Sequence, residues 1–157
     1  MSRKAIFPGT FDPFTIGHYR IVERGLNIFD EIVIGIGVNT GKRTLFSIEK
    51  REQIIRAAFK DEKRVSVSSY DCLTVDFARQ VGAQFVLRGL RTVADFEYER
   101  SMAEANAKLS GLETVALYTD ADNAFVSSTV VRDLYLFGKD ITDFLPPALP
   151  KGILELQ

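Results

Sequence analysis

Residues that could do chemistry follow the short apolar runs of this sequence, and the first is its single histidine. His18 closes the loop after the run Lys4–Phe7, and this loop contains two glycines and two prolines. Such a loop is tight, and a helix start beyond it presents free N–H groups and a positive dipole end, which suit a phosphate. We expect His18 to add a side-chain donor there, although a tight turn with a surface histidine would fit the same residues.

Lys42 and Arg43 follow the second apolar run, Ile32–Val38. Their loop is not a P-loop, because its glycine spacing is one residue short and Arg43 stands where Ser or Thr should hold magnesium. Thr40 occupies the third glycine position of a dinucleotide fingerprint and excludes that motif too. For Arg43 we favour a solvated basic turn, whereas Lys42 fits either such a turn or an anion site.

Arg88 and Arg91 flank Gly89 directly after the apolar run Phe85–Leu87. An arginine beside a core run needs an anionic partner or solvent. The strand-end position favours an anion site. The alternative is a pair of surface cations matched by nearby carboxylates, namely Asp95, Glu97 or Glu99.

Three consecutive hydroxyl residues, Ser127, Ser128 and Thr129, stand at an expected helix start. An ordinary N-cap needs one of them, so two are left for another purpose. Together with the backbone N–H groups of the helix start, they could bind a phosphate chain.

The elements that must position these residues alternate along the chain. The expected strands are Lys4–Phe7, Ile32–Val38, Val65–Val67, Phe85–Leu87 and Val115–Tyr118. The expected helices are His18–Phe29, a second from the N-cap Ser47 to Phe59, Leu73–Val81, Ala94–Leu109, a fifth from Ser127 or Ser128 to near Gly138, and a short one after Pro146 and Pro147. This alternation predicts an α/β fold, a Rossmann-like, doubly wound, parallel five-stranded sheet with helices on both faces, in one domain over residues 1–157. Ligands of such folds bind beyond the carboxyl ends of the strands.

Composition excludes several classes of protein. Twenty Lys and Arg against 21 Asp and Glu give a net charge of -1, which argues against a nucleic-acid or polybasic membrane binder. One cysteine and one histidine exclude a disulfide framework and a cysteine or histidine metal cluster, so no metal-ligating residues are predicted. The lone Cys72 is expected to be a packed or half-buried thiol. No apolar stretch approaches the roughly 20 residues of a membrane span and no signal peptide is evident, which predicts a cytoplasmic protein.

Four loops therefore offer phosphate donors at one edge of the sheet. They carry Thr10 with His18, Lys42, the two arginines, and the three hydroxyl residues. No paired carboxylates and no set of hydroxyl, histidine and acid accompany them. This pattern is typical of direct phosphoryl or nucleotidyl transfer, in which positioning and charge stabilisation do nearly all the work.

The same residues carry a family resemblance over essentially the whole chain. Gly9–Pro13 with Thr15–His18 resembles the first signature of the nucleotidyltransferase superfamily, and Ser127–Arg132 resembles its second. Arg88–Arg91 followed by Ala94–Glu99 resembles the bacterial phosphopantetheine adenylyltransferase family, as do the chain length and the run Phe-Leu-Pro at 144–146.

The resemblance implies that ATP and 4'-phosphopantetheine give dephospho-coenzyme A and pyrophosphate, with Mg²⁺, in coenzyme A biosynthesis. The acceptor phosphate would attack the α-phosphorus of ATP in line, with His18, Lys42 and Arg91 as catalytic residues. The resemblance also implies a homohexamer, and product or coenzyme A binding in the same site.

Site residues follow from the resemblance position by position. The implied acceptor contacts are Thr10, Lys42, Thr74 and Arg88. The implied ATP contacts are Thr10, Phe11, His18, Gly89, Leu90, Arg91, Glu99, Asn123, Ala124, Phe125, Val126, Ser127, Ser128 and Thr129. Some positions depart from the commonest family pattern: Thr74 stands where Leu or Met is usual, and the segment 123–125 replaces a loop that often begins with Trp.

Two other interpretations stay open. One is a small nucleotidyltransferase that acts on another phosphorylated acceptor, such as nicotinate mononucleotide or glycerol phosphate. The run from Arg88 to Glu99 argues against it. The other is a nucleotide-sensing module without catalysis, against which an intact His18 and hydroxyl loop argue.

Overall fold

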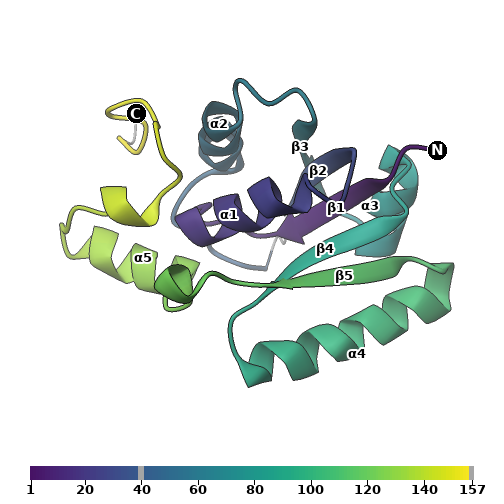
Figure 1. Cartoon of the computed structure of the whole chain (residues 1–157). Coiled ribbons are helices and arrows are strands. Elements are labelled where there is room, and N and C mark those ends of the chain that lie inside the picture. The colour runs from purple at the N-terminus through teal and green to yellow at the C-terminus, as the bar shows by residue number, and fades with distance from the viewer. Residues whose placement is uncertain (39–40, 156–157) are drawn as a thin grey trace.

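In the part of the chain that the structure describes, residues 1–38 and 41–155 of a computed structural model, five parallel strands form one sheet (Figure 1). The strands are β1 (Lys4–Gly9), β2 (Glu31–Gly37), β3 (Val65–Tyr70), β4 (Phe85–Leu90) and β5 (Glu113–Tyr118), in the spatial order β3-β2-β1-β4-β5. The direction of winding reverses between β1 and β4, which places the predicted ligand edge at their carboxyl ends. Thr40, used above to exclude one motif, lies outside the described residues.

All five predicted strands are confirmed, but three run beyond the carboxyl ends of their apolar runs, among them β3, which continues to Tyr70. β1 continues to Gly9 and β4 continues to Leu90. Arg88 and Gly89 therefore belong to a strand rather than to the loop after it. Because a strand is more rigid than a loop, this placement fixes the Arg88 backbone at the edge where β1 ends.

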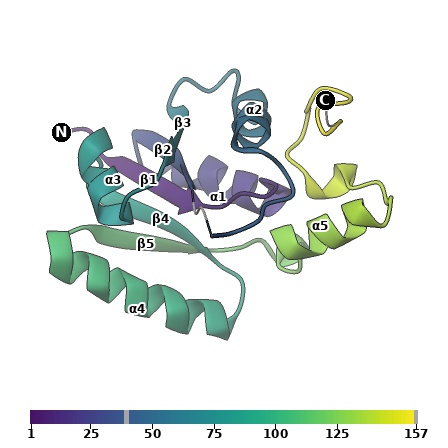
Figure 2. The same ribbon diagram turned by 180° about the vertical axis from the view of Figure 1, so that it is seen from behind.

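Helices cover both faces of the sheet, as predicted. α1 (Ile16–Gly25) and α2 (Ile48–Ala58) lie on one face, and α3 (Thr74–Val81) and α4 (Val93–Ser110) lie on the other (Figures 1 and 2). α5 (Ser128–Leu136) lies beyond the carboxyl ends of the strands, after a short 3₁₀ turn, η1 (Ala121–Asn123).

The two faces are built by alternation along the strands. Ala5 and Phe7 of β1 point to the α1 and α2 side, where Ile21 and Ile54 are buried. Ile6 points to the other side, into a second cluster that holds Val75, Phe77 and Ala78 of α3. α4 contributes no buried residue to either cluster. α1 and α2 thus pack closely on one face of the sheet. On the other face α3 packs closely, and α4 less so.

The predicted helix after the two prolines at 146 and 147 is wrong. A 3₁₀ helix, η2 (Thr142–Phe144), precedes the prolines, and the residues at 151–154 form turns. Gly152 has a φ of 77°, which a helix cannot accommodate. Lys50 and Tyr135 instead hold the segment by hydrogen bonds to the carbonyl oxygens of Ile153 and Leu154. None of the described helices is long and apolar enough to cross a membrane.

Candidate active site

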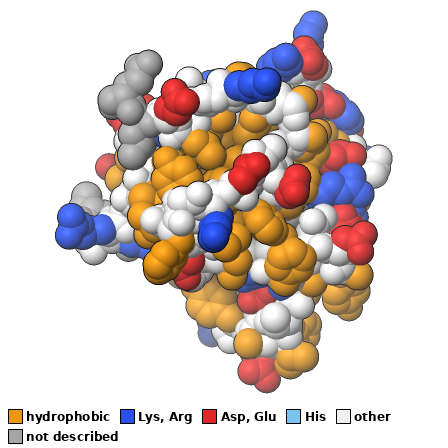
Figure 3. Space-filling view, turned by 90° about the vertical axis from the view of Figure 1, so that its left-hand side faces the viewer, with side chains coloured by type: hydrophobic (Ala, Val, Ile, Leu, Met, Phe, Trp, Pro, Cys, Tyr) orange, Lys and Arg blue, Asp and Glu red, His pale blue; other side chains and the backbone are white. Residues whose placement is uncertain are grey.

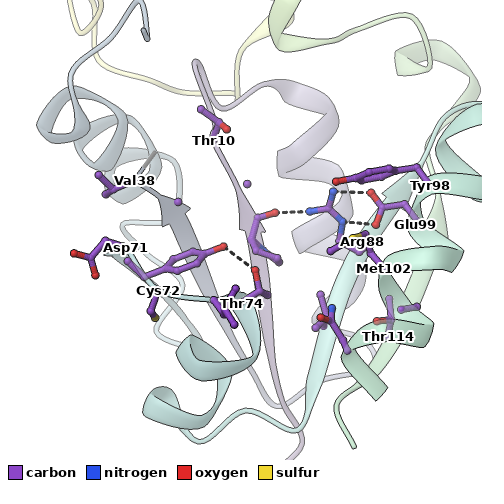
Figure 4. A pocket seen from close by; sticks show the side chains of 18 of the residues that line it. Thr10, Val38, Asp71, Cys72, Thr74, Arg88, Tyr98, Glu99, Met102 and Thr114 are labelled. Atoms are coloured by element: carbon purple, nitrogen blue, oxygen red, sulfur yellow. Dashed lines mark hydrogen bonds and ion pairs between the residues drawn. The ribbon is translucent and has the colours of Figure 1, made fainter. Parts of the chain in front are cut away.

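Two cavities open beside the carboxyl ends of β1 and β4. The α1–α5 cavity, about 420 Å³, lies between the β1 loop, α1 and the start of α5. The α3–α4 cavity, about 390 Å³, lies between α3 and α4 over β1 and β4 (Figure 4). Thr10, Lys42 and Arg88 line both cavities. The two cavities therefore adjoin, with these three side chains among the residues that they share.

The edge of the molecule that carries α5 faces the viewer in Figure 3. Lys and Arg side chains are interspersed there with Asp and Glu around a broad hydrophobic area. The visible Lys and Arg side chains are therefore scattered over this face rather than gathered into one basic patch, which agrees with the net charge of -1.

His18 lies in a capping box at the start of α1, in the wall of the α1–α5 cavity. Its own backbone N–H donates to Thr15 Oγ1 at 3.4 Å, and the Thr15 backbone N–H donates to His18 Nδ1 at 3.0 Å. Nδ1 is therefore an acceptor without a proton, and the proton of the neutral ring is on Nε2. The fold supplies a histidine whose ring donor, Nε2–H, is left for a ligand.

The His18 ring is surrounded by aromatic rings and by positive charge. The centroids of Phe11 and Phe14 are 5.0 and 5.3 Å from its own. Burial, followed by the positive charges of Arg88 and Arg91, lowers the pKa of His18 from 6.5 to about 3. His18 is accordingly neutral at physiological pH and is a hydrogen-bond donor rather than an acid.

Arg88 is held by a bidentate ion pair. Its Nε and NH2 groups donate to the two carboxylate oxygens of Glu99 at 2.8 and 2.6 Å, and NH1 donates to the Pro8 carbonyl oxygen (Figure 4). Of the three carboxylates considered as partners of the arginines, Glu99 is the one that pairs with Arg88. The same fork aims the guanidinium at the junction of the two cavities, both of which it lines.

Arg91 is held less firmly. Its Nε lies 3.4 Å from Asp95 Oδ2, and its NH1 donates to the Val126 carbonyl oxygen at 3.5 Å. Its side chain is 37% exposed, so it can turn toward an anion in the α1–α5 cavity.

The three hydroxyl residues at the start of α5 are all engaged. Ser127 is the N-cap and accepts from the Val130 backbone N–H, while Ser128 donates to the Pro13 carbonyl oxygen at 2.8 Å. Thr129 accepts from Arg132 at 3.2 Å. The hydroxyl of Ser128 thus joins α5 to the β1 loop, and that of Thr129 binds within α5. The groups left to bind an anion at this point are the first backbone N–H groups of α5.

The α3–α4 cavity is lined by both polar and apolar side chains. Lys42 at the mouth donates to Thr10 Oγ1 at 3.4 Å. Thr74 lines the wall, and its hydroxyl pairs with Tyr70 OH at 3.3 Å. Figure 4 shows Thr10 at one end of this cavity and Thr114 at the other. The shape suits a molecule with an anionic head and a long, weakly polar arm.

Within the described residues, no group of three or more His, Cys, Asp and Glu side chains could hold a metal ion. The carboxylates that line the α1–α5 cavity are already engaged, whereas Asp71 lines the α3–α4 cavity. Glu99 pairs with Arg88, Asp95 with Arg91, and Asp12 accepts two backbone N–H groups.

Comparison with known proteins decides the family. The chain is 60% identical to the phosphopantetheine adenylyltransferase of Bacteroides thetaiotaomicron over 94% of this chain and 97% of that protein. It is 50% identical to the phosphopantetheine adenylyltransferase of Flavobacterium psychrophilum, again over 94% of this chain and 97% of that one. The chain belongs to the phosphopantetheine adenylyltransferase family. The predicted enzyme class and reaction, adenylyl transfer from ATP to 4'-phosphopantetheine, are thereby confirmed.

Broader comparisons agree with membership of the phosphopantetheine adenylyltransferase family. The cytidylyltransferase-like family model matches residues 6–134. Two structures of a bifunctional NMN adenylyltransferase/ADP ribose pyrophosphatase from Francisella tularensis, one of them complexed with AMP and a Mn ion, superpose with TM-scores of 0.75 and, for the complex, 0.71. Their identity to this chain is 16–17%, so they show the fold alone. The chain covers 96% of its own length in each match but only 46–47% of those proteins.

Most predicted site residues of this phosphopantetheine adenylyltransferase family member line the expected cavities. All four predicted acceptor contacts line the α3–α4 cavity. The predicted ATP contacts that line the α1–α5 cavity are Thr10, Phe11, His18, Gly89, Arg91, Glu99, Asn123, Val126, Ser127, Ser128 and Thr129. Leu90, Ala124 and Phe125 do not line it, and Phe125 is 62% exposed. The individual contacts with substrate stay predictions.

Sequence reasoning missed the α4 wall of the acceptor cavity. Tyr98, Met102 and Asn106 line it, four residues apart, on one face of α4. That spacing is visible in the sequence, but an apolar stripe on a helix more often packs on a sheet than lines a cavity, so the pattern alone did not single these residues out.

Proposed function

We propose that the adenylyl group is transferred where the two cavities meet, with ATP in the α1–α5 cavity and 4'-phosphopantetheine in the α3–α4 cavity. The observation that carries this proposal is that Thr10, Lys42 and Arg88 line both. These donors hold the acceptor phosphate at the mouth of one cavity, within reach of a nucleotide in the other.

The step balances without a base from the protein. An oxygen of the acceptor phosphate attacks the α-phosphorus of ATP, a new P–O bond forms, and the bond from the α-phosphorus to the bridging β-oxygen breaks. Pyrophosphate leaves with that electron pair. An oxygen of an ionised phosphate needs no deprotonation, because its second pKa is near 6. Catalysis is then positioning plus charge stabilisation.

The chain's donors divide into two groups in this scheme. Lys42, Thr10 and Arg88 bind the acceptor phosphate, and Thr74 contacts the arm. Neutral His18 donates Nε2–H to the ATP phosphates, with Arg91 beside it and the N-terminus of α5 as a further anion site. Phe11, Gly89, Leu90, Glu99 and the segment 123–129 contact the nucleotide.

A divalent metal enters with the substrate in this proposal. Mg²⁺ is commonly bound through substrate phosphates, waters and at most one or two carboxylates. Because the carboxylates that line the α1–α5 cavity are engaged in the pairs described above, we propose that Mg²⁺ arrives as the complex with ATP. The Mn ion in the Francisella structure supports a divalent metal at such a site in that protein. The need for ATP also supports the predicted cytoplasmic location.

We further propose the homohexamer that the family resemblance predicts. Val93, Phe96 and Leu109 of α4 are 77%, 50% and 68% exposed, although they are apolar. Burial of these side chains against other copies of the chain would remove apolar surface that the monomer leaves exposed. Light scattering coupled to gel filtration tests it, and a monomer at micromolar concentration contradicts it.

One assay tests the reaction against its alternatives. The protein is incubated with ATP, Mg²⁺ and one phosphorylated acceptor at a time, namely 4'-phosphopantetheine, nicotinate mononucleotide or glycerol phosphate, and pyrophosphate is measured. We expect turnover with 4'-phosphopantetheine and inhibition by dephospho-coenzyme A and coenzyme A. Turnover with another acceptor alone would overturn the proposal, and ATP binding without any pyrophosphate would favour a sensor.

A further inference from the structure

Asp12 and Arg51 are the most deeply buried charged side chains among the described residues, each 3% exposed. Burial of a charge is costly unless hydrogen bonds and an opposite charge compensate it. Neither side chain has a role in the scheme above. Their partners therefore indicate what these two charges are for.

Both oxygens of the Asp12 carboxylate accept from one distant segment. The backbone N–H of Leu45 donates to Oδ2 at 2.8 Å, and that of Phe46 donates to Oδ1 at 2.9 Å. Asp12 lies in the loop that leads to His18, whereas Leu45 and Phe46 follow Lys42. The carboxylate thus joins the loop of one cavity to the loop that carries the cation of the other.

Arg51, in α2, makes the same connection from the opposite direction. Its NH1 group donates to the Thr10 carbonyl oxygen at 2.9 Å, and its Nε donates to the Phe46 carbonyl oxygen at 3.1 Å. Burial lowers the pKa of the Arg51 guanidinium, and the charge of Asp12 opposes that shift. The two charges compensate each other around the same two loops.

The residues at 41–43, which precede the fixed backbone at 45–46, have room to move. The residues at 41–43 are exposed, and a cavity of about 170 Å³ lies beneath them, lined by Thr10, Lys42, Thr44 and Arg51 among others. Phe46 is fully buried, so it is the point at which this segment rejoins the core. The position of the Lys42 ammonium depends on how firmly the chain is fixed at 45–46.

The start of α5 is tied to the same place. Arg132 donates from NH1 to the Asp12 carbonyl oxygen at 2.9 Å, and Ser128 donates to the Pro13 carbonyl oxygen. Asp12 therefore contacts the Lys42 segment through its side chain and α5 through its backbone.

We propose that Asp12 and Arg51 are positioning residues that hold Lys42 in register with Thr10 and the nucleotide loop. The proposal rests on the proposed function, since it assigns Lys42 to the acceptor phosphate. Neither side chain touches the reacting atoms in it. Asp12 and Arg51 act through the backbone at 45–46, and a small displacement of Lys42 from the in-line geometry would lower the rate steeply.

A double-mutant cycle separates positioning from a general structural role. Asp12→Asn keeps the shape of the side chain but places an amide donor against an N–H group. We expect it to lower kcat/KM for 4'-phosphopantetheine about 10- to 100-fold in the wild-type background. In the Lys42→Ala background the same change should cost less than about threefold, because its target is gone. Asp12 also lines the α1–α5 cavity, so the Kd of ATP is measured in parallel and should change much less than kcat/KM for the acceptor.

The controls make each outcome decisive. Asp61→Asn is the same chemical change at an exposed position and should leave kcat/KM unchanged. An equal loss from Asp12→Asn in both backgrounds would overturn the proposal. Should Asp12→Asn fail to fold, Arg51→Lys, which keeps the charge but cannot reach both carbonyl oxygens, is expected to show the same dependence on Lys42.

Amide hydrogen exchange tests, without any acceptor, whether Asp12 fixes the backbone at 45–46. In Asp12→Asn the amides of Leu45 and Phe46 should exchange at least about tenfold faster, whereas the Ile34 amide in β2 should not change. Unchanged protection of the amides at 45–46 would overturn the proposal that Asp12 fixes this part of the backbone. A wild-type enzyme inactive with 4'-phosphopantetheine would instead overturn the proposed function and leave this measurement standing.

Discussion

The two walls of the site are built differently. On the α5 side, the β1 loop, the Lys42 segment and the start of α5 are joined to one another by hydrogen bonds that converge on Asp12 and Pro13. On the α4 side, an 18-residue helix buries none of its residues and exposes Val93 and Leu109.

This difference separates two tasks. Electrostatic stabilisation of a transferring phosphoryl group needs donors that are fixed before the substrate arrives, and the α5 side supplies them. A long acceptor arm needs a wall that fits it closely. Because α4 buries none of its residues, its exposed side chains can pack against the arm or against a second copy of the chain. Changes on the α5 side should therefore act on kcat, and changes on the α4 side should act on acceptor KM.

The largest expected effect is on the α5 side. His18→Ala removes the Nε2–H donor and should lower kcat by about a hundredfold or more, the scale of losing one preorganised donor. Single-turnover kinetics with saturating ATP and acceptor measure it, with thermal unfolding as the check on the lost capping box. His18→Gln, which retains an N–H donor, should fall between. An unchanged kcat in His18→Ala would remove His18 from the mechanism.

Arg88 lies where the two walls meet, and its replacement should change the KM for the acceptor more than the KM for ATP. Arg88→Ala should raise KM for the acceptor about 10- to 100-fold, the value of a lost hydrogen bond to a charged group, and raise KM for ATP much less. Because this change also leaves the Glu99 carboxylate without its partner, Arg88→Lys, which keeps a positive charge beside Glu99 but loses the bidentate fork, is the matched control and should raise the acceptor KM less than Arg88→Ala. Equal increases in both KM values would contradict the assignment to the acceptor phosphate.

On the α4 side the effect should be smaller and indirect. Phe96 does not line either cavity, so Phe96→Ser should weaken assembly and raise acceptor KM only about 3- to 10-fold, with ATP affinity unchanged. Phe137→Ser makes the same replacement at a residue that is 82% exposed just after α5. Equal effects of the two variants on oligomeric mass would show that α4 has no special role in assembly.

The sequence predicted the fold and the donor loops because both leave local signals. Short apolar runs marked the strands, and Ser47 marked a helix start that the structure confirms. Most predicted site residues line the two cavities for the same reason: parallel strands bring their carboxyl ends to one edge.

What could not be predicted depends on pairing between distant residues. Nothing local distinguishes Asp12 as buried, since its partners lie 33 and 34 residues away. Likewise, the three hydroxyl residues at 127–129 gave no sign that each already had a partner inside the protein. Whether a polar residue is free for a ligand is decided by tertiary contacts that a single sequence does not display.

The smallest expected effect is an absence of change, and it tests how firmly the α5 side is preorganised. Because His18 is the single histidine, its ring gives one resolved NMR titration. Its pKa of about 3 predicts no shift of that signal between pH 8 and pH 5. The unfolded chain, with an ordinary value of 6.5, binds a proton below that pH, whereas the folded chain does not until near pH 3. The free energy of unfolding should therefore fall as the pH drops from 6.5 toward 3. The total loss is at most about 5 kcal/mol, at about 1.4 kcal/mol per pKa unit. His18→Gln should lack that part of the pH dependence, and a wild-type titration near pH 6.5 would show that the ring is neither buried nor held by Thr15.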